Sequence, residues 1–556
     1  MKKTWEVYPP APPEFVNSTG LPPVVAQVLY NRKITGSEEI SSFLNEDSAQ
    51  FHDPRHLPDM DRAIERLAEA VNSGQTVGVF GDFDVDGVTA TALLAQGLEG
   101  LGAKVAPYIP HRVDEGHGLN LEAVQVLKES GVSTLVTVDC GVTSHREVSL
   151  AVDLGMDVII TDHHTPPTVL PPALAIVDPK VPGSTYPFEE LTGAGLAFKL
   201  VQGLYQHLGR PWPRDLLALA ALGTVADLGP LQGENRSIVK EGLTELRRTR
   251  RPGLKALYRR AGLRPDTINS EAISFVIAPR LNASGRLQHA ISSYRLLTAQ
   301  SDDEAESLAA EIEGFNQERR KATEEAYEVA LPKVKAQAPI LMISDESFSP
   351  GISGLVASRL VEEYYKPAIV MALDGELVRA SGRSIPAFNL VSALYQCQEL
   401  FQRFGGHPMA AGFVMARKDL GLLEERLTRI ADQIVGDTEP KPILQIDAEA
   451  APTSLMGQTF KCLTALEPFG AGNPSPVFLA RNMKLLGGWT AGNNGQHLRF
   501  KLNDGRATWT AMAFRQGNGE VPQSKELDLA YTLSTGSWGG ERVLTLKVLD
   551  FRPSEG

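Results

Sequence analysis

The chain has 556 residues, of which 42% are hydrophobic and 22% are charged, and its formal net charge is −13 at pH 7. This length and composition are typical of an ordinary globular protein with three or four domains. The acidic balance argues against coating of nucleic acid by the whole surface, although it allows a local basic channel. No run of about 20 apolar residues is present, so we expect no membrane-spanning helix and no membrane partner.

The cysteines and the first residues bear on the cellular compartment. Cys140, Cys397 and Cys462 are too few and too scattered for a disulfide framework or a thiolate metal site. The opening residues MKKTWEVYPPAPP lack the apolar core of a signal peptide. We therefore expect a cytoplasmic protein, with residues 1–50 forming a separate N-terminal segment.

Short apolar runs alternate with amphipathic stretches between about residues 55 and 230. This alternation predicts an α/β domain over residues 51–301, with a mostly parallel sheet that is covered on both faces. Ligands of such sheets bind just beyond the carboxyl ends of the strands. The predicted strands are TVGVF (76–80), TLVTV (134–138), DVIIT (157–161) and LAIVD (174–178), and the polar residues at their ends are Asp82, Asp139, Asp162, His163 and Asp178.

Three further parts follow along the chain. Residues 302–337 carry small or apolar side chains at spacings of three, four and seven, which predicts one long amphipathic helix that connects two domains. A smaller α/β pattern occupies residues 338–437. From residue 438 to 556, alternating apolar residues separated by Gly- and Asn-rich turns predict an antiparallel β domain.

The stretch GDFDVDG (81–87) places three carboxylates on alternate positions. An EF-hand would need a Glu at the twelfth position, which is Leu93 here, and a helix where a strand is predicted. FDVDGV also resembles the nucleophile motif of haloacid-dehalogenase-type phosphatases, with Asp84 as nucleophile and Asp86 as general acid. A third interpretation is a divalent-metal site at the end of the strand.

Four motifs follow one another along the predicted α/β domain: GDFDVDG, TVDCG (137–141), TDHH (161–164) and GTVADLGPL (223–231). Each motif alone is weak evidence. Together they bring carboxylates and imidazoles to one edge of the sheet, which is the ligand set that Mn²⁺ or Mg²⁺ takes, and imidazole favours Mn²⁺.

This ordered set resembles the DHH phosphoesterase superfamily, which is named for an Asp-His-His triplet. SGRSI (381–385) and FGGHPMAAGF (404–413) are similar to the DHHA1 domain that accompanies many members. EPFGAGNPSPVF (467–478) resembles the start of the OB-type domain in the RecJ branch of single-strand-specific exonucleases. The resemblance implies a DHH domain, a long helix, a DHHA1 domain and an OB-type domain, in that order.

The resemblance also implies a two-metal site. Asp82 and Asp139 would hold one cation, and Asp84, Asp139, His163 and Asp227 would hold the other. His164 would face the scissile phosphate. Asp86 would shape the turn or make a supporting hydrogen bond.

The activity implied by the resemblance is degradation of single-stranded DNA from the 5′ end, in recombination and repair. A superfamily phosphodiesterase that acts on short RNA or cyclic dinucleotides needs only the catalytic residues, and does not explain the β domain. The haloacid-dehalogenase-type phosphatase explains only FDVDGV. A manganese pyrophosphatase would carry His where Gly78 stands, and a non-catalytic DNA-binding relative would lack metal ligands.

Several polar residues are candidates for holding the strand. The basic stretch 247–260 is either a phosphate-tracking wall or a solvated helix face. Residues in the predicted turns IAPRLNASGR (277–286) and SGRS, with others nearby, could hold a terminal 5′-phosphate, because arginine binds phosphate oxygens through a fixed fork of donors. The substrate-binding candidates are Arg112, Arg280, Asn282, Arg286, Ser381, Arg383 and His407.

The predicted β domain contains Trp489, Trp509 and Trp538 beside Arg499 and Lys501. OB-type domains bind single strands by stacking bases on aromatic side chains in a basic groove. Buried core tryptophans are the alternative interpretation. The resemblance further implies single-strand-binding protein and a helicase as partners.

Overall fold

The computed structural model describes residues 3–44, 51–435, 440–492, 495–517, 521–522, 524–538 and 541–554, without the side chains of 536–538 and 541–542. The chain divides into two compact units. The larger unit comprises Ala49–Pro440, of which residues 51–435 and 440 are described, and Gly470–Gly472. The smaller unit contains the described residues up to 44 together with most of those from 441 onward.

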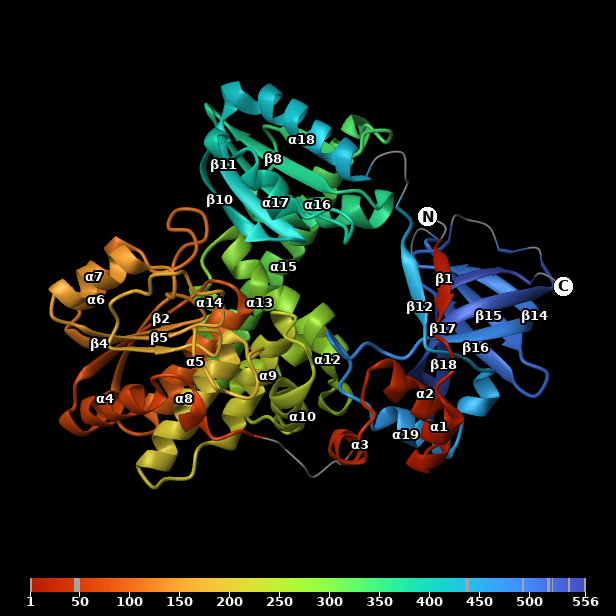
Figure 1. Cartoon of the computed structure of the whole chain (residues 1–556), viewed down its shortest axis with the longest axis horizontal. Helices are drawn as coiled ribbons and strands as arrows, with labels where there is room; N and C mark the ends of the chain where they lie inside the picture. The colour runs from red at the N-terminus through yellow and green to blue at the C-terminus, as the bar shows by residue number, and fades with distance from the viewer. Residues whose placement is uncertain are drawn as a thin grey trace. The chain divides into compact units, whose positions relative to one another are not determined.

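The first sheet of the larger unit is parallel throughout, with the strand order β3-β2-β4-β5-β6. Leu135 of β4 lies in the apolar core with α6 and α7, whereas the next residue, Val136, lies in the core with α4, α5 and α8. Figure 1 shows α6 and α7 on one side of this sheet and α4 and α8 on the other. Coverage of both faces explains the continuous apolar runs and confirms the predicted parallel α/β architecture. The elements are α4 (Met60–Ser73), β2 (Thr76–Gly81), α5 (Val85–Glu99), β3 (Lys104–Tyr108), α6 (Leu121–Glu129), β4 (Val132–Val138), α7 (His145–Asp153), β5 (Asp157–Thr161), β6 (Ala175–Val177) and α8 (Gly193–His207).

A helical region completes this domain and leads into the long helix α15 (Asp302–Ala330). The side chain of Ser301 accepts a hydrogen bond from the backbone N–H of Glu304 and caps the start of α15. The prediction that this helix reaches residue 337 is wrong, because Pro332 follows and a proline cannot continue the i→i−4 hydrogen bonds. The other helices of this region are α9 (Leu217–Ala226), α10 (Gly233–Arg247), α11 (Pro252–Ala261), α12 (Ser270–Ala272), a π-helical turn (Ile273–Ile277), α13 (Ala278–Leu287) and α14 (Ile291–Thr298).

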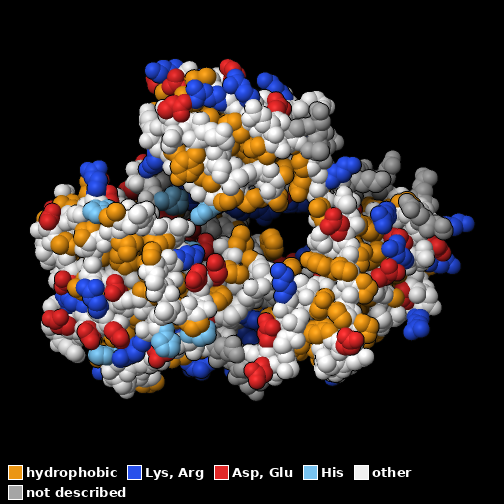
Figure 2. Space-filling view, viewed as in Figure 1, with side chains coloured by type: hydrophobic (Ala, Val, Ile, Leu, Met, Phe, Trp, Pro, Cys, Tyr) orange, Lys and Arg blue, Asp and Glu red, His pale blue; other side chains and the backbone are white. Residues whose placement is uncertain are grey.

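The second α/β domain has a mixed sheet with the order β10-β11-β9-β8-β7, in which only β7 and β8 are parallel. Helix α15 packs against α11, α13 and α14 on one side and against α16 of this domain on the other, so it connects the two domains. Figure 2 shows histidine side chains, in pale blue, at the surface where these two domains meet. The elements are β7 (Leu341–Asp345), α16 (Pro350–Tyr364), β8 (Ala368–Asp374), β9 (Leu377–Arg383), α17 (Leu390–Tyr395), β10 (Phe401–His407), β11 (Ala410–Ala416) and α18 (Leu420–Val435).

The smaller unit is a β barrel to which the N-terminal residues belong. Its sheet has the order β13-β14-β15-β16-β18-β17, and pairing of β14 with β17 closes it. Val25, Val28 and Leu29 of α2 share one apolar core with Phe478 and Phe500 of the barrel. Strand β1 also pairs in parallel with β12. The expected separation of residues 1–50 from residues 438–556 therefore differs from the packing of the described residues. The elements are β1 (Thr4–Val7), α1 (Pro13–Thr19), α2 (Pro23–Asn31), α3 (Ser37–Leu44), β12 (Ile443–Ile446), β13 (Ala448–Glu449), α19 (Gln458–Thr464), β14 (Phe478–Ala491), β15 (His497–Asn503), β16 (Thr508–Ala513), β17 (Glu526–Trp538) and β18 (Glu541–Pro553).

None of the described helices combines the length and the apolar character that crossing a membrane requires.

Candidate metal centre and phosphate pocket

The GDFDVDG stretch forms the tight connection between β2 and α5. Asp84 caps α5, because its Oδ1 accepts hydrogen bonds from the backbone N–H groups of Asp86 at 2.9 Å and Gly87 at 3.1 Å. A Cβ at Gly87 would lie 2.6 Å from the backbone nitrogen of Asp82, so only glycine fits this turn. The Asp82 side chain is buried beside it, with Oδ2 at 2.9 Å from Nδ1 of His117 and with Oδ1 lacking any partner among the described residues.

Asp139 follows β4 and adopts a backbone conformation with φ of 61°. Its N–H donates to the carbonyl of Thr161 at 3.0 Å, which ties the end of β4 to the end of β5. A Cβ at Gly193 would lie 2.6 Å from Oδ1 of Asp139, so this glycine lets α8 begin directly against the carboxylate. Burial and the neighbouring carboxylates of Asp86 and Asp84 raise the pKa of Asp139 well above its usual range.

The Asp-His-His triplet continues from β5 and is organised by Asp162. Its Oδ1 accepts the backbone N–H groups of His163 at 2.8 Å and His164 at 3.1 Å, and also contacts Nδ1 of His164 at 2.7 Å. Its Oδ2 accepts the N–H of Val142 at 2.9 Å. Burial alone would raise the pKa of Asp162, but these hydrogen bonds and the charge of His164 lower it. Asp162 therefore holds the loop and is not available as a metal ligand.

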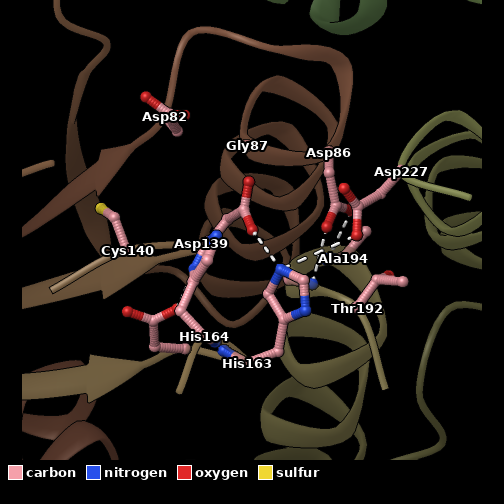
Figure 3. A network of polar contacts seen from close by, with 12 residues as sticks. Asp82, Asp86, Gly87, Asp139, Cys140, His163, His164, Thr192, Ala194 and Asp227 are labelled. Atoms are coloured by element: carbon pink, nitrogen blue, oxygen red, sulfur yellow. Dashed lines mark hydrogen bonds and ion pairs between the residues drawn. The ribbon is translucent and has the colours of Figure 1, made fainter. Parts of the chain in front are cut away.

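The two histidines of the triplet have opposite electrostatic surroundings. Burial, and then the charge of His164, lower the pKa of His163 to about 3, which keeps its imidazole neutral as metal binding requires. The hydrogen bond to Asp162 raises the pKa of His164 to about 9, so its half-exposed ring is cationic at neutral pH. The Nε2 of His163 lies 3.0 Å from Oδ1 of Asp139 and 3.8 Å from Oδ2 of Asp227 (Figure 3).

Asp227 enters the cluster from the end of α9. Burial and the charges of Asp86 and Asp84 raise the pKa of Asp227 to about 8. Mutual repulsion of this kind favours occupation by a cation. Within the described residues, three groups of side chains offer ligand atoms that all lie within 4.8 Å of one another: Asp82, Asp84 and Asp139; Asp86, His163 and Asp227; and Asp139, His163 and His164.

The cluster is suited to hard divalent cations, because carboxylate oxygens dominate and a neutral imidazole completes it. The unpartnered, buried Oδ1 of Asp82 supports the same conclusion, since a shielded acceptor needs a partner. Asp86 also reaches the cluster, but its two oxygens accept the N–H groups of Gly193 at 2.7 Å and Ala194 at 2.9 Å. Figure 3 shows the carboxylate of Asp86 directed toward Ala194 at the start of α8, so Asp86 holds the start of that helix close to the cluster.

Three of the predicted arginines converge next to this cluster. The guanidinium of Arg112 lies 4.7 Å from the centre of the Phe83 ring. In the sequence, Phe83 stands between the first two aspartates of the motif. Arg286 of α13 donates through Nη1 to the carbonyl of Gly351 at 3.1 Å, and Arg383 of β9 packs against Gly354 of α16. Burial and the like charges of Arg112, Arg319 and Arg383 lower the pKa of Arg286 to about 9. The two α/β domains thus both contribute arginines to one basic cluster.

The other substrate-binding candidates have different surroundings. Nε of Arg280 pairs with Oε2 of Glu313 at 2.7 Å and its Nη1 donates to the carbonyl of Val276 at 2.9 Å, so much of its fork is occupied. Asn282 lies on α13 and Ser381 within β9. His407 is the last residue of β10 and is exposed. Burial and the charge of His164 are the main causes of the lowered pKa of His163, and the charge of His407 adds a smaller effect in the same direction.

Two predicted turns are not turns. The segment IAPRLNASGR runs into helix α13, because Pro279 lies in its first turn, where proline is tolerated. Gly285 of this helix is required by close packing, since a Cβ there would lie 2.9 Å from the carbonyl oxygen of Phe83. SGRS continues β9, where a Cβ at Gly382 would lie 2.6 Å from Leu390. Both glycines serve packing, which a sequence pattern does not distinguish from a turn.

Four of the seven basic side chains of the stretch 247–260 contact other parts of the protein. Arg251 donates to Asp215, and Arg259 and Arg260 both contact Glu306. Nε of Arg247 donates to the carbonyl of Ile268. These contacts favour the helix-face interpretation over a phosphate-tracking wall.

Sequence patterns alone did not identify His117 or Arg319 as residues of this region. His117 stands between two glycines in PHRVDEGHGL, and its contact with Asp82 depends on a loop path that local sequence does not specify. Arg319 is one of many charged residues on α15, and no local pattern separates it from its neighbours.

Comparison with known proteins identifies the family. Family models match at residues 76–224 (DHH family, N-terminal domain), 335–436 (DHHA1 domain) and 446–550 (RecJ OB domain). The single-stranded-DNA-specific exonuclease RecJ of Bacillus subtilis is 37% identical over 565 residues, covering 100% of this chain and 71% of that protein. The chain belongs to the RecJ family. The RecJ of Thermus thermophilus is 35% identical over 90% of this chain and 72% of its own length.

Solved structures of the RecJ family agree with the fold. The crystal structure of RecJ in complex with Mn²⁺ from Thermus thermophilus has a TM-score of 0.86 and 32% identity, covering 100% of this chain and 80% of that chain. The corresponding structure in complex with Mg²⁺ has a TM-score of 0.80 and 30% identity, with coverage of 100% and 79%. The predicted order of DHH, DHHA1 and OB domains is confirmed, and the acid–histidine cluster of this chain is a site able to bind metal.

Proposed function

We propose that the protein is a nuclease dependent on Mn²⁺ or Mg²⁺ that degrades single-stranded DNA in the 5′ to 3′ direction, in the cytoplasm, during recombination and repair. The observation that carries the proposal is the convergence of acid and histidine side chains able to bind metal beside a cluster of three arginines. RecJ relatives described as single-stranded-DNA-specific exonucleases support the substrate class.

The ligand roles follow from the family resemblance. Asp82 and Asp139 would hold one cation, and Asp84, Asp139, His163 and Asp227 would hold the second, with Asp139 shared. Two such cations would supply positive charge to the reacting phosphate, to the attacking water and to the leaving oxygen. Asp139 could contact both cations, because its carboxylate offers ligand atoms to one group with Asp82 and Asp84 and to another with His163 and His164.

The protein's own residues orient and neutralise the substrate. His164 is cationic and half-exposed, so it can donate a hydrogen bond to an oxygen of the scissile phosphate. Asp162 fixes the direction of that ring through Nδ1, which leaves Nε2 for the substrate.

The arginine pocket accounts for the proposed direction. Arg112, Arg286 and Arg383 are partly buried and repel one another, so an anion bound among them would offset both costs. A terminal 5′-phosphate carries more charge and more free oxygens than an internal phosphodiester. A pocket of this composition next to the cluster would therefore favour entry of the 5′ end, with Arg280, Asn282, Ser381 and His407 around it.

The β barrel would bind the part of the single-stranded DNA that lies outside the metal centre. Trp489 is 52% exposed on β14, whereas Trp509 is buried and donates its Nε1–H to Asp504 at 3.1 Å. The side chain of Trp538 lies outside the described residues. Trp489 is thus the candidate for base stacking and Trp509 is a core residue. Single-strand-binding protein and a helicase remain proposed partners through the family resemblance.

The test is a cleavage assay with oligonucleotides labelled at the 5′ or the 3′ end, single- or double-stranded, with Mn²⁺, Mg²⁺ or EDTA. We expect mononucleotides to be released from the 5′ end of single strands, and no release in EDTA. Progressive shortening from the 3′ end, or cleavage in EDTA, would contradict the proposal. Short RNA, a cyclic dinucleotide, pyrophosphate and a phosphomonoester in the same series test the other interpretations.

A further inference from the structure

Arg319 on the connecting helix α15 has an unused donor. Its Nη2 donates to Oδ1 of Asn316 at 2.9 Å, while its Nε is shielded from water and has no hydrogen-bond partner among the described residues. Leaving a shielded donor unpaired costs free energy, and native proteins rarely do so. A water molecule or a ligand is therefore expected at this position.

The neighbours of Arg319 indicate the charge of that partner. Arg280 of α13 is close enough that its charge, after burial and Arg320, lowers the pKa of Arg319. The pKa of Arg286 is lowered first by burial and by the charge of Arg112. The charge of Arg319 lowers it further, and does so more than the charge of Arg383. Glu313 compensates Arg280 through its ion pair, but neither Arg286 nor Arg319 has a carboxylate partner within the described part of the chain. A cluster of arginines with so few carboxylate partners favours the binding of an anion.

Residues of α15 fix the orientation of Arg319 in advance. Glu313, Asn316 and Arg319 follow at intervals of three residues, and α15 packs against α13. Asn316 is 2% exposed. Its Nδ2 donates to Oε1 of Glu313 at 3.5 Å, and its Oδ1 accepts from Nη2 of Arg319 at 2.9 Å. A guanidinium held in this way loses little conformational freedom when it binds.

We propose that Arg319 is a phosphate ligand and that, with Arg112, Arg286 and Arg383, it completes the pocket for the terminal 5′-phosphate. The inference rests on the proposed function and extends it, because it adds the connecting helix to the surfaces that contact the substrate. A terminal phosphate offers three free oxygens, which can accept hydrogen bonds from several arginine forks at once. An internal phosphodiester offers only two and carries less charge.

The experiment compares Arg319→Gln and Arg319→Lys with the wild-type protein. Arg320→Gln is the matched control, because Arg320 is the next residue on the same helix, carries the same charge and is exposed. Two quantities are measured on a single strand with either a 5′-phosphate or a 5′-hydroxyl: the ratio of the two kcat/KM values in Mn²⁺, and the ratio of the two binding constants in EDTA. The EDTA measurement does not depend on the metal centre.

We expect Arg319→Gln to reduce both ratios about tenfold, since one charge-assisted contact is lost. Arg319→Lys, which keeps the charge without the fork, should lie between Arg319→Gln and wild type. Arg320→Gln should leave both ratios unchanged. Equal losses on the two substrates would indicate a structural or internal-phosphate role and would overturn the inference, as would wild-type ratios in both variants. Wild-type protein that cleaves no DNA would contradict the proposed function instead.

Discussion

At the scale of single residues, Asp139 is the carboxylate that we propose to be shared by the two cations, and among the described residues it belongs to two of the three groups of possible ligands. We expect Asp139→Ala to lower the rate of hydrolysis at least about 100-fold and to weaken Mn²⁺ binding, because both cations lose a ligand. Binding of single strands should persist, since the arginine pocket is untouched. Cleavage rates, Mn²⁺ titration calorimetry and DNA binding check this. Full Mn²⁺ occupancy in the variant would contradict the shared role.

Asp86 provides the contrasting case. Asp86→Ala should reduce the rate less than Asp82→Ala or Asp84→Ala, because the carboxylate of Asp86 mainly accepts the N–H groups of Gly193 and Ala194. Loss of these bonds leaves buried donors unpaired and should lower the free energy of unfolding by about 1–3 kcal/mol. Melting curves and rates measured together check the two effects. Asp86 more essential than Asp82 would revive the phosphatase interpretation.

The pKa values of the cluster predict how the metal-free protein responds to pH. Between pH 7 and 9, Asp227 with a pKa of about 8 and His164 with a pKa of about 9 bind more protons when folded than when unfolded. The stability of the EDTA-treated protein should therefore fall as pH rises through this window. His163 contributes little there, because its pKa is about 3 in the folded protein and an unfolded histidine is mostly neutral above pH 7. Calorimetric melting at pH 7, 8 and 9 measures the slope.

Bound Mn²⁺ should flatten this pH dependence, because the cation replaces protons as the source of positive charge. Asp227→Asn should reduce the slope in EDTA, since one of the titrating groups is removed. An identical slope with and without Mn²⁺ would contradict the assignment of these groups to the metal centre.

At the scale of elements, two helical glycines predict opposite effects of the same substitution. Gly285→Ala on α13 would bring a Cβ 2.9 Å from the carbonyl of Phe83, so we expect a loss of about 1–3 kcal/mol and a lower cleavage rate as the Asp82–Asp84 connection shifts. Gly314→Ala on α15 meets no atom within 4 Å and should stabilise the protein by about 0.5–1 kcal/mol. Denaturant unfolding of both variants is the measurement. A stabilising Gly285→Ala would show that α13 is free to move.

The parts of the site that could be predicted from the sequence are those that depend on the pattern of the strands. Asp82, Asp139 and His163 follow apolar runs of strand length, and a parallel sheet brings such positions to one edge, so their convergence was predictable. The sequence predicts turns at Gly285 and Gly382, because a glycine needed for contact between distant elements has the same local pattern as a glycine needed for a bend. His117 and Arg319 depend on a loop path and a helix contact that no local signal encodes.

At the scale of the whole molecule, the packing of the N-terminal helices changes how the β barrel can be removed. A chain that ends near residue 440 would leave Val25, Val28 and Leu29 of α2 without their core, whereas a chain of residues 51–440 removes both partners. We expect the second chain to be soluble and to cleave short oligonucleotides, and the first to aggregate. The second should also bind long strands more weakly, since stacking contributes about 1–3 kcal/mol per base.

Michaelis constants on short and long strands measure this effect. Turnover should be largely kept while the Michaelis constant rises only on long strands. Equal binding of long strands with and without the barrel would indicate that the barrel serves a different partner. The aggregation behaviour of the two truncated chains is an independent check on the placement of residues 3–44.

The pairing of β1 with β12 also has a consequence for synthesis in the cell. Trp5 donates a hydrogen bond to Asp550 and β1 lies beside residues 443–446, so β1 needs partners that are synthesised several hundred residues later. At about 5–20 residues per second, roughly 400 residues correspond to a wait of about 20–80 s. The DHH and DHHA1 domains can fold during that interval, as an insertion within an unfinished barrel. The helices α1 to α3 meanwhile expose apolar side chains, which makes them the part of the nascent chain that a chaperone would bind.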